Sequence, residues 1–396
     1  LARTSIEMLL SSLTVVTSAN ACGVGAGDGA GSEPPPPPPQ PARIRVNKES
    51  AVAVINRLSK YFDFMAYCNH VLQHDIALRR AEMTCRVAGI DTLKHIDYKQ
   101  VRVSILLTNA HHSGGNKYYK LKLNIERARQ QNMNTLLSFG GAWSNHIHAL
   151  SEAGLKSGFR TIGVIRGEAP ANPSAMLKDA VGNGMLLHYV SREQYRHKDD
   201  DTFIGALRQK FGGFYLLPEG GSNNDAVLGC QEILNLVNAS DYDIFALPVG
   251  TGGTLAGIVS GLAMSRGAND FSALQSNQQV MGYSSLKGAY DLQASVQQML
   301  NAVTHKDASR NVSSRLPEWH ICHDYHFGGY GKFPNALREF LIAFEYQNGV
   351  KLDPIYTAKM MYGIIDQIDT GSIKSGSRVL VIHTGGLQGR RGYALV

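Results

Sequence analysis

From Thr135 onward, short apolar runs alternate with longer amphipathic segments. The apolar runs have the length and composition of buried strands, at residues 135–139, 161–165, 185–190, 214–217, 242–247, 279–283 and 378–382. Segments with helical spacing of apolar residues lie at 144–158, 202–211, 225–237, 253–266, 289–303 and 334–346, and another at 48–64. Strands that alternate with helices of about 10 to 15 residues form parallel sheets covered by helices on both faces. The pattern therefore predicts an α/β fold.

Pairs of glycines follow several of these predicted strands. They stand at positions 140–141, 220–221, 252–253 and 385–386. Because ligands of parallel α/β sheets bind beyond the carboxyl ends of the strands, we expect the functional site where these glycine-rich turns meet.

The first 43 residues have a different composition. Residues 23–41 are rich in glycine and proline, with Pro34–Pro39 unbroken, and predict a disordered or polyproline tether. The apolar stretch Ile6–Val16 is too short, and too interrupted by polar residues, to span a membrane. Ala19–Cys22 is similar to a signal-peptide cleavage site, which leaves export as an alternative to the cytoplasmic location that we expect.

Composition and charge exclude several classes of function. The net charge of +7 over 396 residues is spread along the chain without a basic block, so we expect no nucleic-acid partner and no membrane partner. The five cysteines are scattered without a CxxC pair, which fits a reducing compartment. His111 and His112 have no carboxylate or cysteine at ligand spacing, so we expect no metal site.

Three segments carry candidate chemistry. Lys117 follows Gly114 and Gly115, and a buried lysine loses its charge, so that its amine becomes a nucleophile and a base. Ser144 and Asn145 stand at the start of a predicted helix, whose free N–H groups bind anions such as a carboxylate. The glycine-rich stretch 250–257 follows a predicted strand and can bind a phosphate.

Residues 250–257 alone leave a second class of protein open, a dinucleotide-binding oxidoreductase. In that class an acidic residue follows the glycine-rich turn by about 20 residues, after a strand. Here only Asp270 stands at that spacing, in a polar stretch without a preceding strand, which counts against this alternative.

Together these segments resemble the pyridoxal-phosphate (PLP) enzymes of the 1-aminocyclopropane-1-carboxylate (ACC) deaminase / D-cysteine desulfhydrase family. Further matching pieces are residues 218–223, Tyr330-Gly331, residues 353–359 and residues 383–387, and the resemblance covers about residues 100–396. It implies the tryptophan-synthase-β-like fold type II, with two three-layer α/β/α lobes, parallel sheets and PLP in the cleft. Residues 1–43 would form the tail, 44–120 and 239–396 the large PLP-binding lobe, and 121–238 the small lobe.

The resemblance also implies roles for individual residues. Lys117 would bind the cofactor covalently, Lys120 would support its phosphate, and Asn145 would bind its ring hydroxyl. Ser144, Asn145 and His146 would bind the substrate carboxylate, with His146 adding a possible charge where many relatives have glutamine. The remaining expected contacts are the phosphate loop Gly250, Thr251, Gly252, Gly253 and Thr254, the ring-packing Tyr356, the substrate-facing Tyr330, Thr384 at the pyridine nitrogen, and Thr357 near the substrate.

Two of these positions favour one activity. ACC deaminases resemble one another in having Glu and Leu where this chain has Thr357 and Thr384, and the hydroxyl residues are similar to the D-cysteine desulfhydrase side. We therefore expect a PLP-dependent lyase, a homodimer, that releases pyruvate, ammonia and sulfide from a small amino acid such as D-cysteine. ACC deamination is the alternative. PLP binding without turnover is a further one, because residues 106–112 depart from the family pattern.

Overall fold

The computed structural model describes residues 92–111, 114–265, 277–304 and 316–395. The predicted tail, the predicted helix at 48–64, Asp270 and the cysteines at 22, 68 and 85 lie outside these residues. Within the described residues, no helix is both long and apolar enough to cross a membrane.

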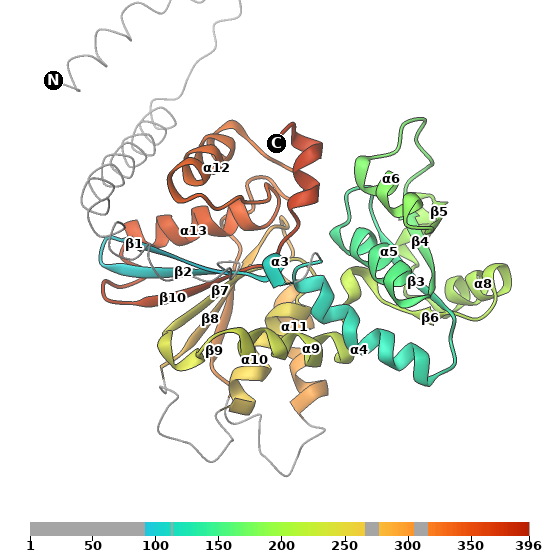
Figure 1. The fold of residues 1–396 in the computed structure, drawn as a ribbon, viewed down its shortest axis with the longest axis horizontal. Coiled ribbons are helices and arrows are strands. Elements are labelled where there is room, and N and C mark those ends of the chain that lie inside the picture. Colours follow the sequence, from blue (N-terminus) through green and yellow to red (C-terminus); the bar gives the residue numbers. More distant parts are fainter. Residues whose placement is uncertain (1–91, 112–113, 266–276, 305–315, 396) are drawn as a thin grey trace, which may run out of the picture. The chain divides into compact units, whose positions relative to one another are not determined.

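Two sheets organise the described part of the chain (Figure 1). The larger sheet has the strand order β1 (Leu93–Tyr98), β2 (Val101–Leu107), β10 (Arg378–His383), β7 (Ile244–Val249), β8 (Gln279–Ser284) and β9 (Glu318–Cys322). The smaller sheet has the order β5 (Leu186–Val190), β4 (Arg160–Arg166), β3 (Thr135–Gly140) and β6 (Tyr215–Leu216). All the neighbouring pairs are parallel except β1 and β2, which form an antiparallel pair that the sequence pattern did not predict.

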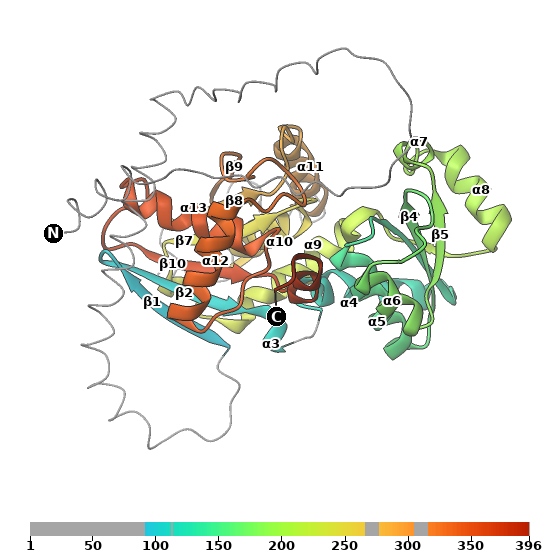
Figure 2. The same ribbon diagram turned by 90° about the horizontal axis from the view of Figure 1, so that it is seen from above.

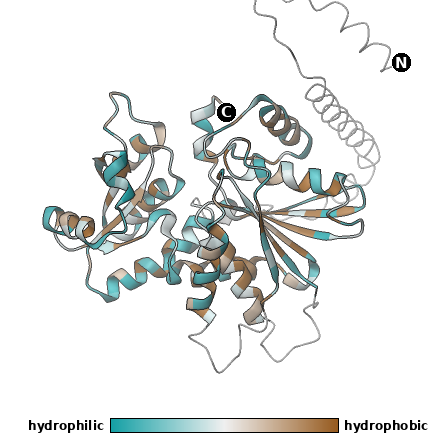
Figure 3. Ribbon diagram, turned by 180° about the vertical axis from the view of Figure 1, so that it is seen from behind, coloured by the Kyte–Doolittle hydropathy of each residue, from teal (hydrophilic) through white to brown (hydrophobic). Residues whose placement is uncertain are grey.

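Helices cover both faces of the larger sheet. On one face α10 (Gly253–Ser265) packs with α4 (Asn116–Gln130), α9 (Asn224–Gln231) and α11 (Leu292–Thr304), and on the other α13 (Thr357–Asp369) packs with α12 (Asn335–Asn348). The strands of this sheet are largely hydrophobic in Figure 3, as expected for strands that are buried on both faces. α10 is buried from Gly253 to Ala263, which explains its nearly continuous run of apolar and small residues.

The smaller sheet is also covered on both faces (Figure 2). Leu136 of β3 packs with α5 (Asn145–Ser157) and α6 (Ala175–Gly182), whereas its neighbour Leu137 packs with α7 (Arg192–Arg196) and α8 (Asp201–Phe211). This alternation follows from the period of two along a strand. Short elements complete the chain: α3 (Thr108–His111) and the 3-10 turns η1 (Glu219–Gly221), η2 (Glu232–Leu236), η3 (Ala239–Asp241) and η6 (Leu387–Tyr393).

The predicted α/β/α architecture with parallel sheets is therefore confirmed. α4 crosses the predicted lobe boundary after residue 120, and it contributes Tyr119 to the core of the larger sheet and Leu121 to that of the smaller one. The lobe boundaries themselves stay a prediction.

Candidate active site

A cavity of about 490 Å³ lies where the turns after β3, β7 and β10 and the end of β4 meet the start of α4. Its lining includes twelve of the residues that the sequence analysis selected: Lys117, Lys120, Ser144, Asn145, His146, Gly250, Thr251, Gly252, Thr254, Tyr330, Tyr356 and Thr384. Residues from both sheets and from distant parts of the sequence thus share one site.

The backbone before α4 places Lys117 in this cavity. Gly115 has φ of +55°, and a Cβ there would lie 2.4 Å from the carbonyl oxygen of Thr384, so only glycine fits. The Asn116 amide N–H donates to the same oxygen at 3.2 Å, and its side chain donates to Thr254 Oγ1 at 2.8 Å. Burial lowers the pKa of Lys117 to about 8, so about a tenth of its amine is unprotonated at pH 7, far more than for an ordinary lysine, and can act as a nucleophile.

Lys120, one turn further along α4, is 2% exposed. Its Nζ donates to Ser222 Oγ at 2.7 Å, to the Gly220 carbonyl at 3.1 Å and to Thr251 Oγ1 at 3.4 Å. Burial, and next the charge of Lys117, lower the pKa of Lys120 to about 7. A buried amine with no carboxylate among these neighbours is suited to an anion, which would favour its charged form.

The glycine-rich turn after β7 faces Lys120. Gly252 has φ of +81°, and a Cβ there would meet Val296 Cγ2 at 2.5 Å. Gly253 begins α10 and does not line the cavity, but its missing side chain leaves room for Lys120, whose Nζ lies 3.2 Å from the position of a Cβ. The N–H groups at the start of α10 and the Lys120 amine together are suited to bind an anion, and we call this place the anion site at Lys120.

Ser144 and Asn145 begin α5 on another wall of the cavity. Ser144 is the N-cap, and its Oγ accepts a hydrogen bond from the Ile147 amide at 3.3 Å, so it caps the helix and lines the cavity at the same time. Asn145 Oδ1 is buried and has no hydrogen-bond partner within the described part of the chain. An orphaned buried oxygen in a cavity wall is free for a ligand hydroxyl.

His146 does not carry the extra charge that the sequence analysis considered. The ring is buried, with Nε2 at 2.8 Å from Ser138 Oγ. Burial first, and then the charges of Lys117 and Lys120, hold the pKa of His146 well below its usual range. The imidazole is therefore neutral, and we correct that expectation.

Two tyrosines form a third wall. The rings of Tyr330 and Tyr356 meet edge to face with centroids 6.1 Å apart. A Cβ at Gly250 would lie 3.2 Å from Tyr356 Cε1, so glycine lets the ring approach the loop. The buried Lys359 holds the Tyr330 segment, because its Nζ donates to the Gly329 carbonyl at 2.8 Å.

Thr357 is placed differently from the expectation. It is fully buried and does not line the cavity, whereas Thr384 does. The Thr357 hydroxyl accepts from the Asp353 amide at 2.7 Å and donates to the Asp353 carboxylate at 3.0 Å. Thr357 therefore stabilises the start of α13, and we withdraw it from the candidate substrate contacts.

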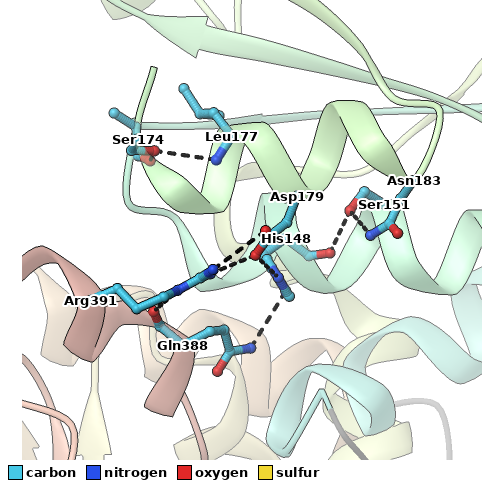
Figure 4. A network of polar contacts seen from close by, with 9 residues as sticks. His148, Ser151, Ser174, Leu177, Asp179, Asn183, Gln388 and Arg391 are labelled. Carbon is cyan, nitrogen blue, oxygen red and sulfur yellow. Dashed lines mark hydrogen bonds and ion pairs between the residues drawn. The ribbon is translucent and has the colours of Figure 1, made fainter. Parts of the chain in front are cut away.

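Several lining residues were missed by the sequence analysis: Asn116, Arg166, Glu219 and Gln388. Arg166 directly follows a predicted strand, and Glu219 belongs to a matched motif, so their positions gave a usable signal. No signal in the sequence pointed to Gln388, because its place at the cavity depends on tertiary contacts of η6 with α5 and α6. There Asp179 lies 3.1 Å from His148 Nε2 and pairs with Arg391, while Gln388 Nε2 lies 3.5 Å from His148 Nδ1 (Figure 4).

These residues fit PLP. The amine of Lys117 suits the cofactor aldehyde, the anion site at Lys120 suits its phosphate, and the unpartnered Asn145 Oδ1 suits its ring hydroxyl. When bound, PLP supplies an aldehyde that reacts with amines and a conjugated ring that accepts an electron pair from the substrate Cα.

Known proteins support the same assignment. Two curated relatives are a bifunctional D-cysteine desulfhydrase/ACC deaminase of Arabidopsis thaliana and a D-cysteine desulfhydrase of Salmonella newport. The first is 28% identical over 69% of this chain and 69% of its own length, and the second is 26% identical over 69% and 82%. A crystal structure of an ACC deaminase homologue has the same fold, with a TM-score of 0.63, 22% identity, and coverage of 78% of this chain and 93% of that chain. The family of pyridoxal-phosphate dependent enzymes matches residues 93–385, nearly the whole described region, and the chain belongs to that family.

Proposed function

We propose that the protein eliminates the β-substituent of a small amino acid, in the manner of a D-cysteine desulfhydrase. One observation carries this proposal: Lys117, with a pKa of about 8, shares a cavity with two separate anion-binding helix starts. One helix start suits the cofactor phosphate and the other the substrate carboxylate. Elimination from D-cysteine would give pyruvate, ammonia and sulfide.

The chain's own residues supply the remaining steps. The N–H groups at the start of α5 would bind the substrate carboxylate and orient Cα toward the Lys117 amine. That amine, partly neutral at pH 7, would remove the Cα proton. Tyr330, 42% exposed on the cavity wall, would face the β-substituent and close one side of the cavity to water.

Thr384 favours desulfhydration over ACC deamination. It is a neutral residue on the cavity wall, at the position expected to face the pyridine nitrogen. A neutral partner leaves that nitrogen largely unprotonated and weakens the electron sink, which suits elimination of a good leaving group. The bifunctional name of the Arabidopsis relative keeps ACC deamination as the second candidate.

The test compares two products from one purified preparation saturated with PLP. We expect pyruvate from D-cysteine at a higher kcat/KM than 2-oxobutanoate from ACC, and neither product from Lys117→Ala. Faster turnover of ACC would reverse the choice of activity. Pyruvate from neither enantiomer of cysteine, together with no 2-oxobutanoate, would indicate PLP binding without turnover.

We further infer a cytoplasmic homodimer. The scattered cysteines support a reducing compartment, and Cys230 and Cys322 are buried free thiols. Light scattering on the purified chain measures the mass of the assembly and contradicts the dimer if it returns the mass of a monomer.

A further inference from the structure

Two charged residues of the cavity wall have no part in the proposed reaction. They are Arg166, the last residue of β4, and Glu219, the first residue of η1. A charge that lines a substrate cavity either has a partner in the protein or selects the ligand, so the partners of each decide its role.

Glu219 has partners in the protein. Its carboxylate accepts a hydrogen bond from the Tyr195 hydroxyl at 2.9 Å and lies 3.8 Å from the Lys198 amine. These contacts satisfy much of its charge, so Glu219 neither needs nor favours a cationic ligand.

Arg166 has no such partner. Its guanidinium lies over the Tyr195 ring, 5.7 Å from the centroid, and forms no ion pair or hydrogen bond with the other described residues. Stacking on a ring leaves the N–H donors at the edge of the guanidinium plane available. Arg166 thus presents to the cavity a cation that has no direct counter-ion among the described residues.

The position of this cation relates it to the substrate. Arg166 Nη2 lies 3.9 Å from the point where a Cβ of Gly141 would stand, beside the turn that leads to Ser144. Tyr330 lines the same cavity: burial raises the pKa of its phenol, and the Arg166 charge partly opposes the shift. Arg166 therefore lies beside the turn that leads to the proposed carboxylate site, in the cavity that it shares with the tyrosine proposed to face the β-substituent.

We propose that Arg166 binds a second anionic group on the substrate, so that the cavity accepts small amino acids whose β-substituent ends in an oxyanion. This assignment rests on the proposed function and names its substrate class. The planar fork of a guanidinium matches the paired oxygens of a phosphate or carboxylate, and such charge-assisted hydrogen bonds are the strong ones.

O-phosphoserine is an example of such a substrate, and its β-elimination would run as follows. The Cα proton passes to Lys117, the Cβ–O bond breaks, and its electron pair leaves with inorganic phosphate. Water then replaces the amino group of the resulting enamine, and the products are pyruvate and ammonia. No oxidant or reductant is required.

A binding measurement tests Arg166 without turnover. Calorimetry on the PLP-saturated protein compares succinate with butanoate, which differ in the second carboxylate. We expect succinate to bind about tenfold more tightly, a modest ratio because solvent screens the exposed Arg166, and we expect Arg166→Gln to remove the preference. Arg160→Gln is the matched control, because Arg160 is exposed at the other end of β4 and does not line the cavity.

Turnover provides the second readout. Arg166→Gln should lower kcat/KM for O-phosphoserine about tenfold while changing that for the neutral ester O-acetylserine less than about threefold. A succinate preference that survives Arg166→Gln overturns the assignment. So does an equal loss for succinate and butanoate, which would place Arg166 at the first carboxylate. Absence of pyruvate from every amino acid would contradict the elimination and leave the succinate comparison standing.

Discussion

At the scale of single residues, the site depends on lysines that the fold holds away from water. Lys117 and Lys120 lie one helical turn apart, so both amines enter the same cavity from α4. They differ in surroundings. Lys120 is held by three oxygen atoms, whereas among the described residues the Lys117 amine has only Asn116 Oδ1, at 3.4 Å. Lys117 is therefore the freer amine and the better nucleophile, and Lys120 the fixed donor.

Replacing each lysine separates these roles. Lys117→Ala should abolish the near-violet absorbance of the protein with PLP, and borohydride should then attach no cofactor to the chain. Lys120→Ala should keep the band but raise the PLP concentration needed for half saturation about 10- to 100-fold. A loss of affinity of this size is expected when charged hydrogen bonds to the phosphate are removed. Lys122→Ala, which removes an amine paired with Glu232 outside the cavity, is the control. A reduced adduct that mass spectrometry places on Lys120 would exchange the two assignments.

At the scale of elements, the apolar pattern predicted seven of the strands and missed β1, β2 and β9. β2 (VRVSILL) is mostly buried and parallel to β10, but Arg102 and Ser104 interrupt its apolar run. β1 (LKHIDY) and β9 (EWHIC) are edge strands with charged and exposed positions, so they lack a strong apolar run. α4 was missed because polar residues, Asn116, Lys120 and Asn124, share its buried face with Leu121 and Ile125. The predicted helix 225–237 ends as α9 at Gln231 and continues as the 3-10 turn η2.

The position of the site could be predicted from the sequence, but the orientation of some of its side chains could not. Motif positions predicted the cavity wall, because strand ends of parallel sheets converge. The orientation of a side chain depends on tertiary neighbours, so the sequence could not tell that Thr357 turns to Asp353 or that burial keeps His146 neutral.

The crossing of α4 and α9 gives a prediction at this scale. A Cβ at Gly229 of α9 would lie 2.1 Å from the Tyr119 carbonyl of α4, so Gly229→Ala must push the two helices apart. We expect a loss of about 1–3 kcal/mol in the free energy of unfolding, measured in urea, and weaker PLP binding because Lys120 follows Tyr119. Gly205→Ala in α8, where a Cβ meets no atom of the described residues within 4 Å, should instead stabilise by up to about 1 kcal/mol. If the two substitutions changed the free energy of unfolding equally, the close approach of α9 to α4 at Gly229 would be contradicted.

At the scale of the whole molecule, residues of both sheets line one cavity. Burying lysine amines lowers the free energy of unfolding of the whole protein as long as these amines are charged. Lys120 has a pKa of about 7, and Lys117 and Lys359 have pKa values of about 8, against 10.5 for an ordinary lysine. Burial is the largest cause in each case. Each lysine is therefore more easily deprotonated in the folded than in the unfolded chain.

This difference fixes how the stability of the cofactor-free protein depends on pH. Above about pH 7 the folded state begins to lose protons that the unfolded chain keeps until about pH 10, so the unfolded state binds more protons and the free energy of unfolding rises with pH. Between pH 7 and pH 8.5, below the range where tyrosines ionise in the unfolded chain, we expect a gain of the order of 1 kcal/mol for each lysine, measured by urea unfolding. Lys359→Met should reduce the rise of the free energy of unfolding with pH. Lys122→Ala should leave this rise unchanged, because the pKa of Lys122 is not lowered by folding. Saturating PLP should reduce the slope, because its phosphate favours the charged form of Lys120. A free energy of unfolding that is constant or falls over this interval would show that the three amines are protonated in the folded protein.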